Sequence, residues 1–148
     1  MTLAQVLSGE LHGVFRWTDL DRGRGDGAVD EAEAAAGRAG WRWVLLDSTA
    51  ATDKPSFLDV CAEAFDLPAW FGRNWDGLDE CMRGLDLDEP AGLLVLWKGW
   101  AGLAEGDPDA FDCALEVFRD ACVAWNDDDV PGAVLLAGDG PDADLPDL

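Results

Sequence analysis

The sequence predicts a small α/β domain with a three-stranded parallel sheet packed with about four helices, preceded by an N-terminal extension. Three largely apolar runs, residues 41–47, 93–97 and 133–137, are typical of strands buried on both faces. Amphipathic stretches lie between these runs, and strands that alternate with helices pair in parallel through right-handed crossovers. With 148 residues, of which 49% are hydrophobic, the chain has the size and composition of about one domain.

The helices are predicted from their start positions and from the spacing of their apolar residues. Pro55 and Pro108 suit the first turn of a helix, where a missing N–H is tolerated. Asn74 is a favourable N-cap, and Asp76 in the following turn complements the helix dipole. We expect helices near residues 55–65, 74–85, 100–104 and 108–125. In the second of them, four residues form one apolar stripe: Trp75, Leu78, Met82 and Leu85.

The remaining segments are expected to lie outside this domain. Residues 1–40 form a partly ordered extension, with a strand-like stretch at 11–17, a loop composition at 19–30 and a short helix at 31–36. Residues 41–138 form the domain itself. Residues 139–148 contain four Asp and two Pro, which predicts a disordered acidic tail that can be removed with little effect on stability.

The charge balance excludes several classes of partner. The chain has 31 acidic and 10 basic residues, a net charge of −21, and residues 41–138 alone hold 20 acids against 6 bases. Such a surface repels nucleic acid and anionic membranes and attracts a basic protein or cations, although solubility or an acid-rich proteome explains it equally well. The longest run without a charged or polar side chain is nine residues, 130–138, and a membrane span needs about 20. The N-terminus lacks the pattern of a signal peptide, so we expect a cytoplasmic protein.

The sequence offers little support for catalysis or for a metal site. It has one histidine, His12, and three serines, none of them in a nucleophile motif, so we expect no enzyme and no cofactor. The cysteines show no zinc-binding spacing, so we expect no metal and predict buried thiols rather than disulfides. These four residues are Cys61, Cys81, Cys113 and Cys122.

The strongest local feature is an acidic segment around the second helix. Residues 66–89 hold seven acids and two bases. Asp76, Asp79 and Glu80 are spaced i, i+3 and i+4, so they share a helix face turned away from the apolar stripe, where their repulsion is unfavourable. By composition alone, this face is equally well explained as an ordinary solvated helix surface.

Residues 67–82, LPAWFGRNWDGLDECM, resemble the signature of the barstar family, the intracellular inhibitors of secreted microbial ribonucleases. That signature runs Leu-Pro, two aromatic residues, Gly, any residue, Asn, an apolar residue, Asp, a small residue, Leu, and then an acid before Cys. The resemblance extends over about residues 41–138. It implies a three-stranded parallel sheet with packed helices, in agreement with the fold predicted from the residues.

The resemblance also implies which residues bind the ribonuclease. Trp70 resembles an aromatic residue that packs on the enzyme, and Glu80 takes the place of the central carboxylate that enters the enzyme's phosphate-binding pocket. Four differences from the usual pattern affect the target. Glu80 replaces Asp, Asp79 and Leu85 each stand in the place of an aromatic residue, and Arg73 adds a positive charge. The full set of implied contacts is Trp70, Gly72, Asn74, Asp76, Asp79, Glu80, Val117 and Asp120.

These observations predict an inhibitor that plugs the active site of a basic, secreted ribonuclease of the guanyl-preferring type. We expect a protein partner, no nucleic acid and no membrane, and a monomer when the inhibitor is free. Two alternatives remain. One is a barstar-like module that binds a different basic toxin or effector protein, and the other is an acidic carboxylate enzyme or metal protein.

Overall fold

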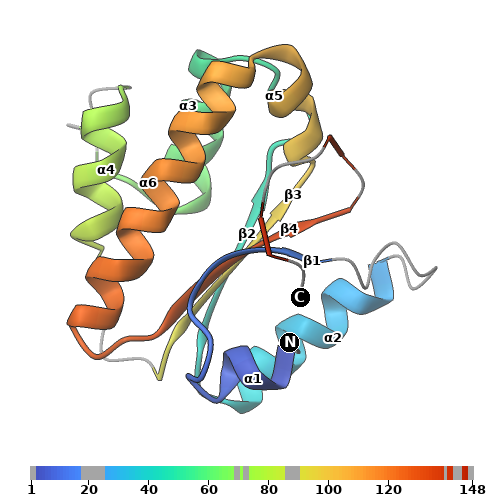
Figure 1. Cartoon of the computed structure of the whole chain (residues 1–148), viewed down its shortest axis with the longest axis vertical. Helices are drawn as coiled ribbons and strands as arrows, with labels where there is room; N and C mark the ends of the chain where they lie inside the picture. Colours follow the sequence, from blue (N-terminus) through green and yellow to red (C-terminus); the bar gives the residue numbers. More distant parts are fainter. Residues whose placement is uncertain are drawn as a thin grey trace.

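The computed structural model describes residues 3–17, 26–68, 71, 74–85, 91–138, 140–141 and 145–146, with the backbone alone at 26–28. Within these residues the chain forms a mixed α/β fold of six helices around one parallel sheet. Figure 1 shows the sheet as a central layer with helices on both sides. The α/β class and the parallel pairing predicted from the sequence are both confirmed.

The sheet has four strands, where the sequence analysis predicted three. The expected strands are present as β2 (Arg42–Asp47), β3 (Leu93–Lys98) and β4 (Gly132–Ala137). The fourth is β1 (Gly13–Trp17), which pairs in parallel with β4 and gives the order β1-β4-β3-β2. The strand-like stretch of the N-terminal extension therefore belongs to the same sheet.

Four helices cover the first face of the sheet, as Figure 1 shows. They are α3 (Lys54–Ala64), α4 (Trp75–Arg83), α5 (Trp100–Gly106) and α6 (Pro108–Asp127), close to the predicted ranges. The caps explain where they begin. The Asp53 carboxylate accepts a hydrogen bond from the Ser56 N–H (3.0 Å), and the Asp107 carboxylate accepts one from the Ala110 N–H (3.2 Å).

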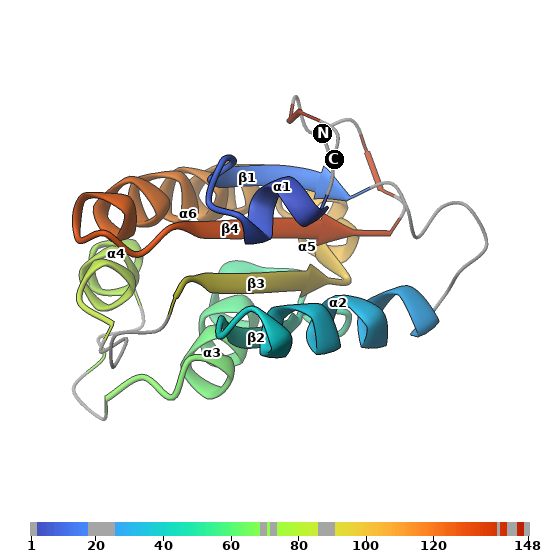
Figure 2. The same ribbon diagram turned by 90° about the horizontal axis from the view of Figure 1, so that it is seen from below.

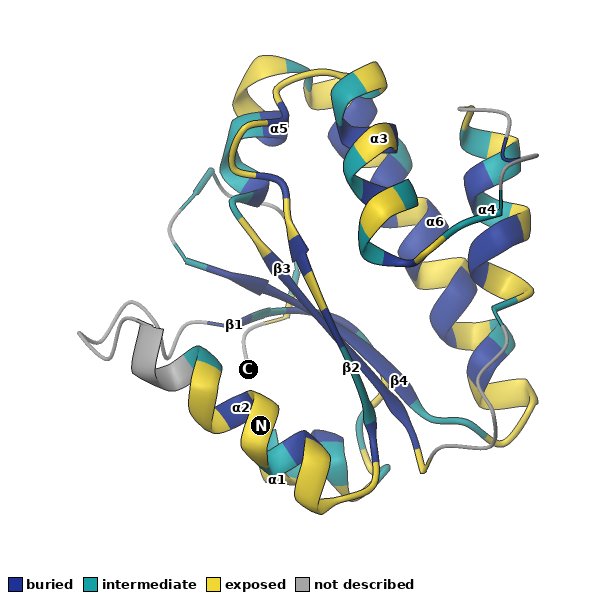
Figure 3. Cartoon of the chain, turned by 180° about the vertical axis from the view of Figure 1, so that it is seen from behind, coloured by how far each residue is buried: buried dark blue, intermediate teal, exposed yellow. Residues whose placement is uncertain are grey.

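Two N-terminal helices cover the second face of the sheet. They are α1 (Leu3–Leu7) and α2 (Asp26–Arg38), and Figure 2 shows them in front of the strands, with α3 and α6 behind. Leu94, Leu96 and Leu135 point to this face and are fully buried in a cluster with residues of α1, β1 and α2. In Figure 3 both central strands, β3 and β4, are coloured almost entirely as buried. The alternating side chains of the strands thus supply two separate cores, a first core on the side of α3–α6 and a second core on the side of α1 and α2.

The described part of the C-terminal segment contacts the fold. The Pro146 carbonyl accepts a hydrogen bond from the Arg16 N–H of β1 (2.9 Å), and Leu145 packs against the first core. A Cβ atom at Gly140 would come within 2.4 Å of the Trp100 ring, so glycine permits close packing there. These contacts give a physical reason to expect that residues 139–148 contribute to stability, contrary to the expectation from their composition.

All four cysteines are free, as predicted, and Cys61, Cys81 and Cys122 are buried. Burial raises the pKa of Cys61 and Cys81, and it raises the pKa of Cys122 to about 12. These thiols are therefore poor nucleophiles at neutral pH. In the described part of the chain, the helices are all too short or too polar to cross a membrane.

Candidate partner-binding face

Helix α4 begins at the cap that the sequence predicted. The Asn74 side-chain oxygen accepts a hydrogen bond from the Gly77 N–H (2.6 Å). Asp76 lies in the first turn, where its negative charge interacts favourably with the helix dipole. Next to the cap, the ring centroids of Trp75 and Phe57 lie 6.2 Å apart, and the Lys54 ammonium nitrogen lies 5.8 Å from the Trp75 ring centroid. Contacts with α3 therefore fix the N-terminal end of α4.

The C-terminal half of α4 is held by α6. Leu78, Cys81 and Met82 are buried between the two helices and the sheet. The indole N–H of Trp125 in α6 donates a hydrogen bond to the Met82 carbonyl (2.8 Å), and both groups are buried. Because α4 is fixed at both ends, its outward side chains project from a rigid support.

Asp76 and Glu80 lie on the outward face of α4, and both are exposed. The structure gives neither carboxylate a hydrogen bond or an ion pair with any described residue. Two unpaired carboxylates one helical turn apart can accept charge-assisted hydrogen bonds from the guanidinium or ammonium groups of a partner. We call the surface formed by Asp76, Asp79, Glu80 and Arg83 of α4 with Asp120 of α6 the α4 acidic face.

Asp79 differs from these two residues because it is already paired. Its carboxylate binds the Arg83 guanidinium one turn later in α4. This contact, together with a weaker attraction from Asp120 of α6, raises the pKa of Arg83. Arg83 is a residue of the face that the sequence analysis missed, although its i+4 spacing from Asp79 is visible in the sequence.

The structure brings some of the other expected contacts to this face and leaves others away from it. Asp120 is exposed on α6, beside α4, whereas Val117 is only 6% exposed and packs in the core. Asn74 serves as the helix cap. Trp70 and Gly72 lie outside the described residues. The set predicted for partner binding therefore stays a prediction, with Asp76, Glu80 and Asp120 as its exposed acidic members.

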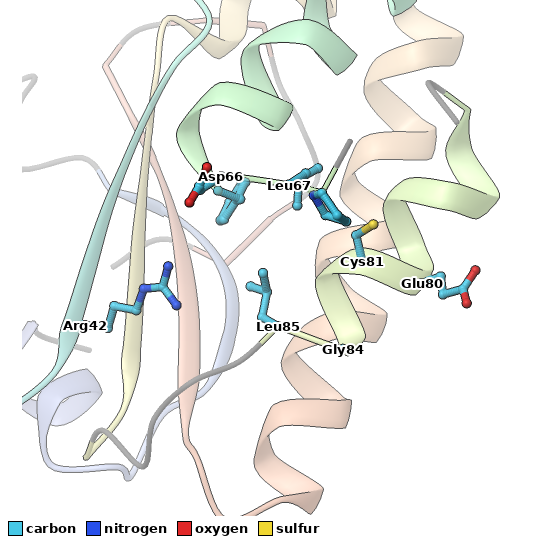
Figure 4. A pocket seen from close by; sticks show the side chains of 9 residues that line it. Arg42, Asp66, Leu67, Glu80, Cys81, Gly84 and Leu85 are labelled. Atoms are coloured by element: carbon cyan, nitrogen blue, oxygen red, sulfur yellow. The ribbon is translucent and has the colours of Figure 1, made fainter. Parts of the chain in front are cut away.

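A pocket of about 470 Å³ lies beside the C-terminal half of α4. It is lined by Arg42, Phe65, Asp66, Leu67, Pro68, Glu80, Cys81, Gly84 and Leu85. Figure 4 shows the Arg42 side chain extending toward Leu85, while the Glu80 carboxylate points away from these residues. The pocket therefore borders the α4 acidic face at Glu80, but the Glu80 carboxylate is directed away from it. Among the described residues, no three His, Cys, Asp or Glu side chains gather as metal ligands.

Comparison with known families matches residues 41–137 to the model of Barstar (barnase inhibitor). This chain belongs to the barstar family. The match begins just before β2 and ends with β4, so it includes α4, α6 and the whole α4 acidic face. Members of the barstar family are inhibitors of barnase-type ribonucleases rather than enzymes. Comparison with curated proteins finds no match.

Proposed function

We propose that this barstar-family chain inhibits a basic, guanyl-preferring ribonuclease by placing the α4 acidic face against the enzyme's active site. The observation that carries the proposal is the pair of exposed carboxylates, Asp76 and Glu80, which have no polar partner among the described residues and lie on a rigidly held helix of a barstar-family domain. A ribonuclease site that binds RNA phosphates offers clustered basic groups. Carboxylates can replace the phosphates there because both accept charge-assisted hydrogen bonds.

The proposed inhibitor acts as a monomer that binds one enzyme molecule in the cytoplasm of the producing cell. Residues 41–138 carry 20 acids and 6 bases, so the approach of a basic partner is electrostatically favoured. Steered complexes associate at up to about 10⁸–10⁹ M⁻¹s⁻¹ at low salt, against about 10⁵–10⁶ for unsteered ones. Stopped-flow mixing over a range of ionic strength tests this, and a rate independent of salt would contradict steering.

The decisive experiment is a titration of purified guanyl-specific ribonucleases with the parent protein and with Glu80→Ala. Removing one member of a desolvated charge pair weakens binding by about 2–5 kcal/mol, mainly through faster dissociation. Asp76→Ala is expected to weaken binding too. It also lowers stability slightly, since a favourable first-turn charge is lost.

Glu105→Ala is the matched control, because Glu105 is also an exposed glutamate in a helix but lies on α5. Equal losses for Glu80→Ala and Glu105→Ala would mean that bulk charge alone determines binding. If the parent inhibits none of the ribonucleases, the proposed target class is wrong. Capture of a non-ribonuclease basic protein from the producing organism would then favour the alternative of another toxin or effector.

A further inference from the structure

Arg83 has two carboxylates of its own helix within reach. It lies three residues after Glu80 and four after Asp79, and both spacings bring side chains together on a helix surface. The two choices differ in their effect on the α4 acidic face. An Arg83–Glu80 pair would neutralise the most accessible carboxylate of the last turns, whereas an Arg83–Asp79 pair leaves Glu80 unpaired.

The structure shows that Arg83 takes the second choice. Its guanidinium binds Asp79, and the Asp120 carboxylate of the neighbouring helix α6 adds a weaker attraction. Glu80 has no polar partner among the described residues, and Figure 4 shows its carboxylate directed outward. Of the two contacts that the local spacing allows, the structure therefore contains the one that keeps Glu80 accessible.

The accessibility of Asp79 argues against a direct role in binding. One carboxylate oxygen is bound to Arg83, and the other is buried without a hydrogen bond to any described group. The Asp79 side chain is 22% exposed, against 55% for Arg83. Neither Asp79 oxygen is therefore presented to a partner in the way that the Glu80 carboxylate is.

We propose that Asp79 is a positioning residue that holds Arg83 away from Glu80 and so keeps Glu80 available to a cationic partner. This inference rests on the proposed function for the identity of the partner and deepens it. It changes the role expected for Asp79, which acts through Arg83 instead of touching the ribonuclease. It also makes Arg83 a determinant of specificity, because Arg83 would neutralise Glu80 if it were released.

A double-mutant cycle on ribonuclease binding tests the assignment. The released variant is Asp79→Ala, and we expect it to bind at least tenfold more weakly than the control variant Asp112→Ala. Both variants lose one helical aspartate, so bulk charge is matched. Adding Arg83→Gln to the released variant should restore binding to within about threefold of the Arg83→Gln single variant.

Two results would overturn the proposal. If Arg83→Gln fails to restore binding to the released variant, Asp79 contacts the enzyme directly. If the released variant and the control bind equally, only net charge matters. Melting temperatures of all variants identify any loss that comes from misfolding.

A second measurement on the free protein needs no ribonuclease. We expect side-chain NMR to show a through-space contact between Arg83 and Glu80 in the released variant and none in the parent. A contact already present in the parent, or absent from the released variant, refutes the positioning role. If the parent binds no ribonuclease, the proposed function fails while this measurement still decides the inference.

Discussion

The N-terminal segment covers one whole face of the sheet, so its removal is expected to destabilise this barstar-family chain severely. Leu94, Leu96 and Leu135 are fully buried against α1, β1 and α2. Fully burying a leucine contributes about 1.5–3 kcal/mol, so these three side chains account for about 4.5–9 kcal/mol. The free energy of unfolding of a whole domain is about 5–15 kcal/mol. Deleting residues 1–40 should therefore remove most of the stability, although the family match starts at residue 41.

Urea unfolding and size-exclusion chromatography of the 41–148 fragment measure this effect. We expect the fragment to be largely unfolded or aggregated, because a bare apolar sheet face favours association. A monomeric fragment with an unfolding free energy within about 1 kcal/mol of the parent would refute the reasoning, because exposing these leucine side chains to water should lower that free energy by several kcal/mol.

A matched pair of point variants tests the same face within the full chain. Ala32 of α2 is fully buried in the second core, and Ala34 of the same helix is exposed. Ala32→Glu forces a charge into that core and should lower the melting temperature by many degrees. Ala34→Glu should stay within about 0.5 kcal/mol of the parent. Equal behaviour of the two variants would show that α2 does not pack on the sheet.

Three further results are expected. Deleting residues 139–148 removes the backbone and core contacts of the C-terminal segment, so calorimetry should show a melting temperature lower by several degrees. Trp125→Phe leaves the buried Met82 carbonyl without its donor, which costs about 1–3 kcal/mol in urea unfolding. Hydrogen bonds from the Ser56 hydroxyl and N–H lower the pKa of Asp53 from 3.8, so its stabilising effect is complete above that value and is lost as the pH falls through the lower folded-state pKa. The difference in melting temperature between the parent and Asp53→Ala should be constant above about pH 3.8 and shrink as the pH falls below that value, and a difference that does not shrink at low pH would contradict this.

Much of the fold could be predicted from local features of the sequence. The uncharged runs at residues 93–97 of β3 and 132–137 of β4 indicate strands buried on both faces, and Asn74 and Pro108 indicate where α4 and α6 begin. The role of residues 13–17 could not be predicted in this way. Their strand character is local, but their partner is β4 at the other end of the chain, and hydrophobic periodicity carries no information about such pairing.

The candidate site shows the same division between local and long-range information. The shared helix face of Asp76 and Glu80 follows from their spacing. The pairing of Arg83 does not, because Asp79 and Glu80 are both within its reach and their spacing alone does not determine which of them it binds. The burial of Val117 likewise depends on how α6 packs against the rest of the fold.

The pairing of β1 with β4 has a consequence for the synthesis of the protein. A ribosome makes β1 first, but the strand that supplies its hydrogen bonds is the last strand of the chain. Parallel pairing between such distant segments closes a long loop and is intrinsically slow. Helices α4 and α6 are both complete before β4 emerges, so the surface that carries Asp76 and Glu80 is synthesised before the sheet can close. Until then β1 remains an apolar strand without its partner, and the nascent chain is most vulnerable to aggregation in that interval.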